Sequence, residues 1–346
     1  MSAPNCASAR STFFPCCYIQ VHERWTDRNT TLTRDLVGSP QAGCTSAYSS
    51  ELNSVDCTPP RGCRMDIVEK YAGPDLLRHY SDGGYLSLFT ALALLPETVM
   101  TAGSPRALVI GGGAGEMATT LTTHFRTLEI DVLEPDATVI RMARRHFGFD
   151  ASVWRDGARV HAGTARYERV RVLETDALRW LQRVASSEAF RYDYVVLDAY
   201  VTKERSVTDM PDVFASAEFC AALAAALQPH GVVTAQLFRN DQNGAAFRRH
   251  CERIFERSFL MGHHRLPREA QWWSVGQRVV VLAGSGAADA RAADAPCTRE
   301  HAAAAELDRF AVAASQLSTR SRLPYDLGRL VRGRHYEFRL RGRRCS

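Results

Sequence analysis

The sequence has very few lysines and no long apolar run. Lys70 and Lys203 are the two lysines, so arginine carries nearly all of the positive charge and cannot act as a proton shuttle. No apolar segment approaches the ~20 residues that a membrane-spanning helix needs. The N-terminal residues lack a charged segment followed by a long apolar core, so we expect no secretory signal. These absences predict a cytoplasmic protein that has no contact with a membrane.

Cysteines are present but lack the spacing of a metal or redox site. Ten are scattered along the chain, and no CxxC pair occurs among them. Cys16 and Cys17 are adjacent, but no second pair follows at metal-ligand spacing. The pattern predicts reduced thiols and no bound metal.

Positive charge is concentrated at the C-terminal end. The net charge is +5, but residues 320–346 contain nine arginines and two acids, which leaves the rest of the chain slightly acidic. Such a segment can be an RNA-binding arm, an extension that packs on an acidic surface of the protein's own dimer, or a disordered end. The last two are commoner, so we do not expect a nucleic acid as partner.

The chain is organised around residues 107–134. A short apolar run of strand character comes first, followed by glycines, a helix-compatible segment, a second apolar strand and an acid. This order is half of a nucleotide-binding α/β unit, in which Glu134 can accept hydrogen bonds from both ribose hydroxyls. The parts are Ala107–Ile110, Gly111–Gly115, Glu116–Phe125, Leu128–Leu133 and Glu134.

The spacing of the glycines limits the class of ligand that the loop can bind. Gly111, Gly113 and Gly115 form a GxGxG pattern, whereas the dinucleotide fingerprint would need a glycine at Glu116. The N-terminus of a helix attracts a pyrophosphate, but the negative charge of Glu116 at this position would repel it. The pattern favours a nucleoside without phosphates, such as S-adenosylmethionine or its decarboxylated form, over NAD or FAD.

Three successive strands are followed by carboxylates. Glu134 follows the second predicted strand, Asp176 the third at Val170–Leu173, and Asp198 the fourth at Tyr192–Leu197. Ligands of open α/β sheets lie at the carboxyl ends of the strands, so the acids indicate a cationic ligand rich in hydroxyls and amines. The alternative for a single acid is a helix cap, a role open to Asp176 and Asp136.

Strands and helices alternate over most of the chain, which predicts a doubly wound, mostly parallel α/β sheet. We expect a flexible N-terminus (1–12), and then a small β-domain with a loop insertion and a lead-in helix (13–100). A Rossmann-like nucleoside-binding domain (101–285) follows. An alanine-rich linker that leads to a helix, and an arginine-rich extension, end the chain (286–346). The strands of the first domain are predicted at Phe13–Val21 and Thr31–Val37, the loop at 38–64, and the helices at Asp66–Tyr80 and Gly84–Pro96.

Five segments together resemble the spermidine synthase family, the polyamine aminopropyltransferases. They are VIGGGAGE (109–116), LEPDATVIRMARRHFGF (133–149), VLETDALRWL (172–181), YDYVVLDAY (192–200) and FCAALAAALQPHGVVTAQLF (219–238). The resemblance runs from about Phe13 to Ser285. It implies a class I methyltransferase fold behind a small N-terminal β-domain, decarboxylated S-adenosylmethionine as co-substrate, an amine acceptor and a homodimer.

The resemblance also implies roles for individual residues. Gly111, Gly112, Gly113 and Gly115 would form the nucleoside loop. Glu134 would bind the ribose, Asp176 the adenine with Ala177 beside it, and Asp198 would be the catalytic acid/base.

The acceptor side departs from the family pattern. Ala114 and Val201 replace acids, and Cys16–Cys17 align with a tyrosine–glutamine pair. Tyr85, Tyr200 and Asp209 are candidate substitute contacts. We therefore expect a divergent, spermidine-synthase-like aminopropyltransferase, with two alternatives: a methyltransferase that uses S-adenosylmethionine, and an inactive paralogue that acts as a dimer partner.

Overall fold

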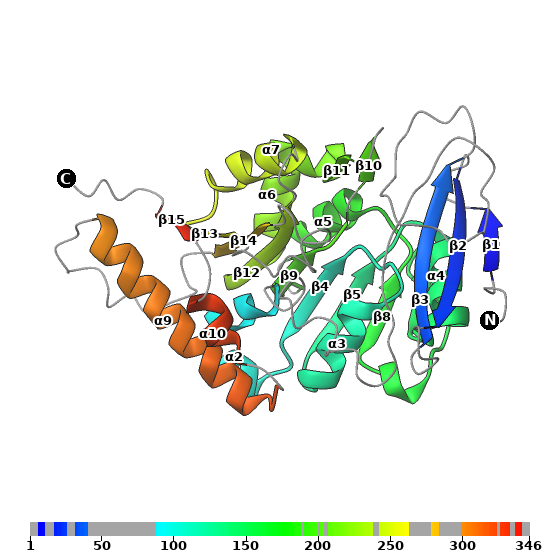
Figure 1. Ribbon diagram of the computed structural model, residues 1–346, viewed down its shortest axis with the longest axis horizontal. Helices are drawn as coiled ribbons and strands as arrows, with labels where there is room; N and C mark the ends of the chain where they lie inside the picture. Colours follow the sequence, from blue (N-terminus) through cyan, green and yellow to red (C-terminus); the bar gives the residue numbers. More distant parts are fainter. Residues whose placement is uncertain are drawn as a thin grey trace.

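The computed structural model is built on a ten-stranded sheet that has helices on both faces (Figure 1). It describes residues 6–10, 17–25, 32–40, 88–187, 190–199, 201–203, 207–237, 242–262, 278–283, 299–323, 326–332 and 336–340. The order of the strands across the large sheet is β15-β13-β14-β12-β9-β4-β5-β8-β6-β7.

Five parallel strands form the centre of this sheet. They run third, second, first, fourth and fifth in chain order, which is the doubly wound arrangement. The predicted α/β class, Rossmann-like and mostly parallel, is confirmed. The five are β4 (Arg106–Ile110), β5 (Glu129–Leu133), β8 (Val170–Leu173), β9 (Tyr192–Leu197) and β12 (Leu227–Leu237).

Strands at both margins extend the sheet, and several of them had no clear pattern in the sequence. β6 pairs parallel with β8, and β7 turns back antiparallel along β6. At the other margin, β14 runs antiparallel to β12, β13 to β14, and β15 to β13. Their bounds are Ser152–Arg155 for β6, Ala158–His161 for β7, Arg257–Gly262 for β13, Arg278–Ala283 for β14 and Tyr336–Leu340 for β15.

Two apolar layers cover the sheet. One face packs against η2 (Ala91–Leu94), α2 (Glu97–Ala102), α3 (Glu116–His124), α4 (Ala137–Phe147), α9 (Arg299–Arg320) and α10 (Leu327–Arg332). The other packs against α5 (Ala177–Ala185), α6 (Ala217–Ala225) and α7 (Gln242–Cys251). Within the described ranges, no helix is both long and apolar enough to span a membrane.

A buried polar network fixes the central strands relative to one another. Asp131 of β5 binds the guanidinium of Arg171 in β8 through both carboxylate oxygens, at 2.7 and 2.8 Å. Tyr192 of β9 donates its hydroxyl to Asp131 Oδ2 at 2.7 Å, and Trp180 of α5 donates to Tyr192 at 2.9 Å. A satisfied network of this kind makes the register of β5, β8 and β9 specific.

α4 begins and ends where its sequence predicts. The carboxylate of Asp136 accepts a 2.7 Å hydrogen bond from the Thr138 backbone N–H, which caps the first turn. Gly148 ends the helix in the left-handed region, with φ of 69°. This helix leads directly away from Glu134, so its caps also fix the chain beside that residue.

A separate three-stranded antiparallel sheet precedes the main body. It consists of β1 (Cys6–Arg10), β2 (Cys17–Trp25) and β3 (Leu32–Pro40), and β2 and β3 pack near α4 (Figure 1). The two predicted strands are confirmed with shifted bounds. β1 lies within residues 1–12 and pairs with β2, so part of this segment has strand structure; its flexibility stays a prediction.

The remaining N-terminal predictions are tested only in part. The loop predicted at 38–64 is wrong for its first three residues, which belong to β3. Residues 41–87 lie outside the described part, and with them the rest of the loop and the predicted helix Asp66–Tyr80. The lead-in helix predicted at Gly84–Pro96 is described from Leu88, where it passes into the 3₁₀ turn η2. The division of the chain into domains stays a prediction.

The C-terminal region belongs to the fold. Residues 286–346 are predicted as a linker and an extension, but α9 buries one face and packs against α10 and η2. Phe310, Ala314 and Leu317 lie at helical spacing, and all three are buried. β15, within the arginine-rich segment, pairs with β13. α9 is the helix expected after the alanine-rich segment, and β15 shows that part of the arginine-rich extension is a strand of the large sheet.

Gly328→Ala is expected to destabilise the protein, because α9 and α10 touch at Gly328. A Cβ there would collide with the Ser315 hydroxyl and the Ala311 carbonyl. We expect a loss of about 1–3 kcal/mol in urea unfolding. Gly103→Ala is the matched control, since its new Cβ would make an ordinary 3.4 Å contact. Equal stability of the two variants would show that the α9–α10 contact does not contribute.

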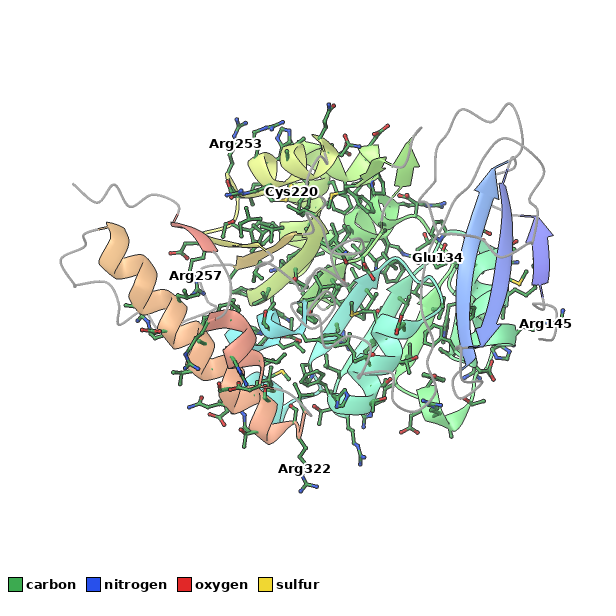
Figure 2. The ribbon with its side chains drawn as sticks, in the orientation of Figure 1. Glu134, Arg145, Cys220, Arg253, Arg257 and Arg322 are labelled. Carbon is green, nitrogen blue, oxygen red and sulfur yellow. A yellow bond between two sulfur atoms is a disulfide. The ribbon has the colours of Figure 1, made fainter. Side chains whose placement is uncertain are left out.

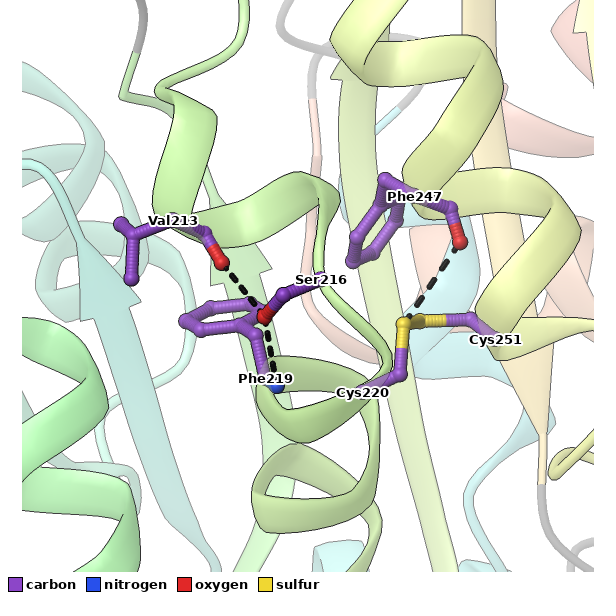
Figure 3. The surroundings of a disulfide bond; sticks show 6 residues. All are labelled: Val213, Ser216, Phe219, Cys220, Phe247 and Cys251. Carbon is purple, nitrogen blue, oxygen red and sulfur yellow. Dashed lines mark hydrogen bonds between the residues drawn. A yellow bond between two sulfur atoms is a disulfide. The ribbon is translucent and has the colours of Figure 1, made fainter.

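One pair of cysteines is not reduced. Cys220 of α6 and Cys251 of α7 form a disulfide with a Cα–Cα distance of 5.1 Å (Figure 3). The prediction of reduced thiols is therefore wrong for this pair, which lies 31 residues apart without a motif and meets because α6 packs on α7. The cytoplasmic localisation stays a prediction.

Candidate active site

Four parallel strands end at the same level, and the residues that follow them form the candidate site. The register pairs Ile110 with Leu197 and Leu133, and Leu133 with Leu173. The next residues along this edge are therefore Asp198, Gly111, Glu134 and Glu174, in that order. The structure brings Glu134 and Asp198 to one edge, as the sequence indicates, and neighbouring strands lie about 4.8 Å apart.

Gly111 lets β4 turn away directly beside Asp198. Its N–H donates to the Leu133 carbonyl at 3.0 Å, and the Asp198 N–H donates to the Ile110 carbonyl at 2.9 Å. The φ of Gly111 is 104°, and a Cβ there would collide with the backbone carbonyl of Asp198. Only glycine satisfies both conditions, so the turn and the position of Asp198 depend on each other.

Glu134 is folded against the glycine turn. Its Oε2 accepts hydrogen bonds from the N–H groups of Gly112 at 3.1 Å and Gly113 at 3.4 Å. Its Oε1 accepts from the Asp136 N–H at 3.0 Å. A Cβ on Gly112 would lie 2.9 Å from the Glu134 Cβ, so this glycine admits the close approach. The carboxylate is thus held at the end of β5 (Figure 2).

Burial raises the pKa of Glu134 from its usual range to about 7. Desolvation is the largest cause, and the negative charge of Asp136 adds to it. The three backbone N–H bonds act in the opposite direction without cancelling the effect. Glu134 therefore changes charge near neutral pH.

Nucleoside affinity is expected to rise with pH, by about tenfold per pH unit up to about pH 7, and then to level off. Ribose hydroxyls donate to a carboxylate, so a protonated Glu134 must first release its proton. Stability of the free protein changes in the opposite sense. The pKa of Glu134 is higher in the native state than in the unfolded state. Its contribution to the free energy of unfolding is therefore fully present below about pH 4.5 and is lost as the pH rises through 7.

Calorimetric titration with decarboxylated S-adenosylmethionine at several pH values measures this dependence. In Glu134→Gln the slope should vanish, because the amide does not titrate. An unchanged slope in that variant would assign the dependence to another group.

Asp176 occupies the end of the edge beyond β8, where it caps α5. Its Oδ1 accepts a 3.1 Å hydrogen bond from the Arg179 N–H, so the helix-cap interpretation applies to this residue. A carboxylate has about four lone-pair positions, so the cap does not exclude a ligand. Ala177 beside it is buried. The adenine role of both residues stays a prediction.

Glu174 is an edge carboxylate that the sequence interpretation gave no role. It follows β8 directly, which is the signal that identified Glu134 and Asp198. Its Oε2 accepts from the Arg155 guanidinium at 2.6 Å, so an arginine at the end of β6 balances its charge. The pair also joins the turn after β6 to the end of β8.

The acceptor side of the edge is framed by a short hairpin. β10 (Val201–Lys203) starts three residues after Asp198, and β11 (Val207–Asp209) pairs with it so that Asp209 lies opposite Val201. Asp209 is thus across from the position where the family resemblance expects an acid. Tyr85 and Tyr200 lie outside the described residues, and the side chain of Asp209 is not described. Their substrate roles stay predictions.

No metal cluster accompanies these residues. In the part of the chain that the structure describes, no group of three or more histidines, cysteines and acids is arranged to hold a metal ion.

The fold is of the Rossmann-like methyltransferase type. A structure of human methyltransferase-like protein 13 in complex with SAH is similar, with a TM-score of 0.50 and 18% identity over 70% of this chain and 93% of that one. A probable spermidine synthase from Corynebacterium glutamicum ATCC 13032 aligns over 91% of this chain and 93% of its own, with 12% identity and a TM-score of 0.46.

Sequence comparison relates part of the chain to a known family. Residues 91–247 match the spermine/spermidine synthase domain, so this part of the chain is similar to that family. A polyamine aminopropyltransferase of Vibrio vulnificus (strain CMCP6) is 27% identical over 147 residues, which is 41% of this chain. The match spans 42% of the length of that relative.

Proposed function

We propose that the protein is a transferase that moves an aminopropyl group from decarboxylated S-adenosylmethionine to a di- or polyamine. The observation that carries this proposal is the order of residues along the carboxyl edge. Asp176, Glu134, the glycine turn and Asp198 follow one another across four adjacent strands. That order corresponds to adenine, ribose, sulfonium and acceptor amine along an extended donor.

The charge of the edge suits this donor. Decarboxylated S-adenosylmethionine carries a sulfonium and an ammonium group, and the acceptor is also a cation. Glu134, Asp176 and Asp198 supply carboxylates, and they lie at one edge of the sheet, where their negative charges act together on a cationic ligand. The N–H groups of Gly112 and Gly113 orient Glu134 before the ligand arrives. Binding therefore needs little rearrangement on the nucleoside side.

Asp198 would act on the acceptor. A new bond forms between the amine nitrogen and the propyl carbon beside sulfur, the carbon–sulfur bond breaks, and methylthioadenosine leaves with the electron pair. The Asp198 carboxylate holds the amine and takes the proton that the nitrogen loses. The sulfonium is already a good leaving group, so positioning and deprotonation are the main tasks of the protein.

Release of methylthioadenosine tests the proposal. We expect its formation when the purified protein is incubated with decarboxylated S-adenosylmethionine and putrescine or a longer polyamine. Mass spectrometry should find the aminopropylated acceptor in equal amount. No release with any of several diamines would overturn aminopropyl transfer.

Methyl transfer from S-adenosylmethionine is the second candidate, favoured by the fold similarity to human methyltransferase-like protein 13. The same mass spectrometric assay separates the two, because the acceptor would gain a methyl group. The inactive-paralogue alternative starts from Ala114 and Val201, which stand where the family has acids. It predicts no product with either donor and co-purification with an active partner.

A further inference from the structure

The disulfide Cys220–Cys251 lies inside the helical layer next to the acceptor side. Both cysteines are fully buried, and they join α6 to the last residue of α7. Their position is close-packed, because Phe219 stacks on Phe214 with ring centroids 4.4 Å apart, and Phe247 lies 6.4 Å from Phe219. The bond thus fixes two helices that share one apolar core.

A second connection joins α6 to the 3₁₀ turn η4 (Asp212–Ala215). Ser216 lies between the two elements, and its hydroxyl donates to the Val213 carbonyl at 2.8 Å. The same oxygen accepts from the Phe219 N–H at 3.0 Å and caps α6 (Figure 3). The Ser216 hydroxyl therefore links the turn directly to the helix.

A third connection joins α7 back to η4. Asn243, in the first turn of α7, donates from its side-chain nitrogen to the Met210 carbonyl at 2.7 Å and to Asp212 Oδ1 at 2.6 Å. The disulfide lies at the opposite end of this helix, about 12 Å away at 1.5 Å per residue. The disulfide joins α6 to α7, Ser216 joins α6 to η4, and Asn243 joins α7 to η4. We call these three mutually connected elements the triangle.

The triangle is continuous with the hairpin beside Asp198. Met210 directly follows Asp209, the last residue of β11. Asp209 pairs with Val201, and β10 leads back to Asp198 within three residues. α7 also packs against β11 (Figure 1). The nucleoside residues belong to other elements, since Glu134 follows β5 and the glycine turn follows β4.

We propose that this triangle positions the acceptor side of the site, with Asn243 as a positioning residue and the Cys220–Cys251 disulfide as its covalent tie. The inference rests on the proposed function for the meaning of "acceptor side". Asn243, Cys220 and Cys251 thereby gain a role although they lie outside the nucleoside site. Loosening the triangle shifts β11 and the hairpin, and leaves Glu134 and the glycine turn in place.

Reduction is one way to loosen it. An external dithiol supplies two electrons and two protons, becomes a disulfide itself, and converts Cys220 and Cys251 to thiols. The Cys220 sulfur lies 3.5 Å from the Phe247 carbonyl, so the thiol has an acceptor within the same core. The helices can then remain packed while their covalent tie is lost.

The test is hydrogen–deuterium exchange combined with kinetics on the full chain. Dithiothreitol reduction and, separately, Asn243→Ala with the disulfide intact are each expected to speed exchange at residues 207–216 by about tenfold, since each removes a restraint on that segment. Exchange at residues 129–147 should not change. The KM for putrescine should rise by about tenfold, whereas the dissociation constant of decarboxylated S-adenosylmethionine should stay the same.

Gln182→Ala is the matched control. Gln182 donates to Glu218 Oε1 at 2.8 Å, and this bond joins α5 to α6 without touching α7 or η4. It should leave exchange at 207–216 unchanged. Unchanged exchange there after reduction and in Asn243→Ala would overturn the proposal, and so would an equal weakening of nucleoside binding. The exchange result needs no turnover, so it stays informative if aminopropyl transfer itself is absent.

Discussion

Asp198→Asn is expected to lower kcat by about 10²–10⁴-fold, because it removes the proposed general base and leaves the shape of the site intact. The residue is fixed by its backbone bond to Ile110 and by the close approach of Gly111. An asparagine of the same size can keep that geometry but cannot take a proton from the amine. Initial rates of methylthioadenosine release measure the effect.

Asp193→Asn is the control for this variant. Asp193 lies near the other end of β9, where it accepts from the Arg106 N–H at 2.8 Å and contacts His230 at 2.6 Å. That change should cost stability without a comparable loss in kcat. Binding of decarboxylated S-adenosylmethionine to Asp198→Asn should be retained within a few-fold. Unchanged turnover in Asp198→Asn would remove Asp198 from the chemistry and count against both transferase proposals.

Glu134→Gln is expected to weaken nucleoside binding by about 100-fold, since charge-assisted hydrogen bonds to the ribose would be lost. The amide would also point a donor at the N–H groups of Gly112 and Gly113 or at that of Asp136, where the carboxylate now accepts. Calorimetry with decarboxylated S-adenosylmethionine above pH 7 gives the ratio directly.

Glu129→Gln provides the matched comparison on the same strand. Glu129 begins β5 at the far end from the site, is exposed, and lies 3.6 Å from the Arg106 guanidinium. The Glu129→Gln variant should bind the nucleoside with unchanged affinity. Equal affinities of the wild type and Glu134→Gln would contradict the ribose role of Glu134.

The sequence was sufficient for the part of the fold in which local patterns decide structure. The buried strands β4, β5, β8 and β9 are apolar runs, and α4 has an Asp cap and a Gly stop at its ends. The edge residues Glu134 and Asp198 could be identified because they directly follow such strands, whose carboxyl ends share one edge.

Features set by contacts distant in sequence could not be predicted. β1, β13 and β15 pair through their backbones, and the arginines around β15 conceal its strand character. Cys220 and Cys251 meet only once α6 packs on α7. At the site, the arginine partner of Glu174 comes from β6, 19 residues earlier in the chain. Bonds between Glu134 and the glycine turn likewise depend on the register of β4 and β5.

Calorimetric titration of the wild-type protein with decarboxylated S-adenosylmethionine and with S-adenosylmethionine tests the central claim most directly. The two donors differ by one carboxylate, which would add negative charge beside Glu134, Asp176 and Asp198. We expect saturable one-to-one binding of the decarboxylated form, about tenfold tighter than that of S-adenosylmethionine. No binding of either nucleoside, or tighter binding of S-adenosylmethionine, would contradict the account.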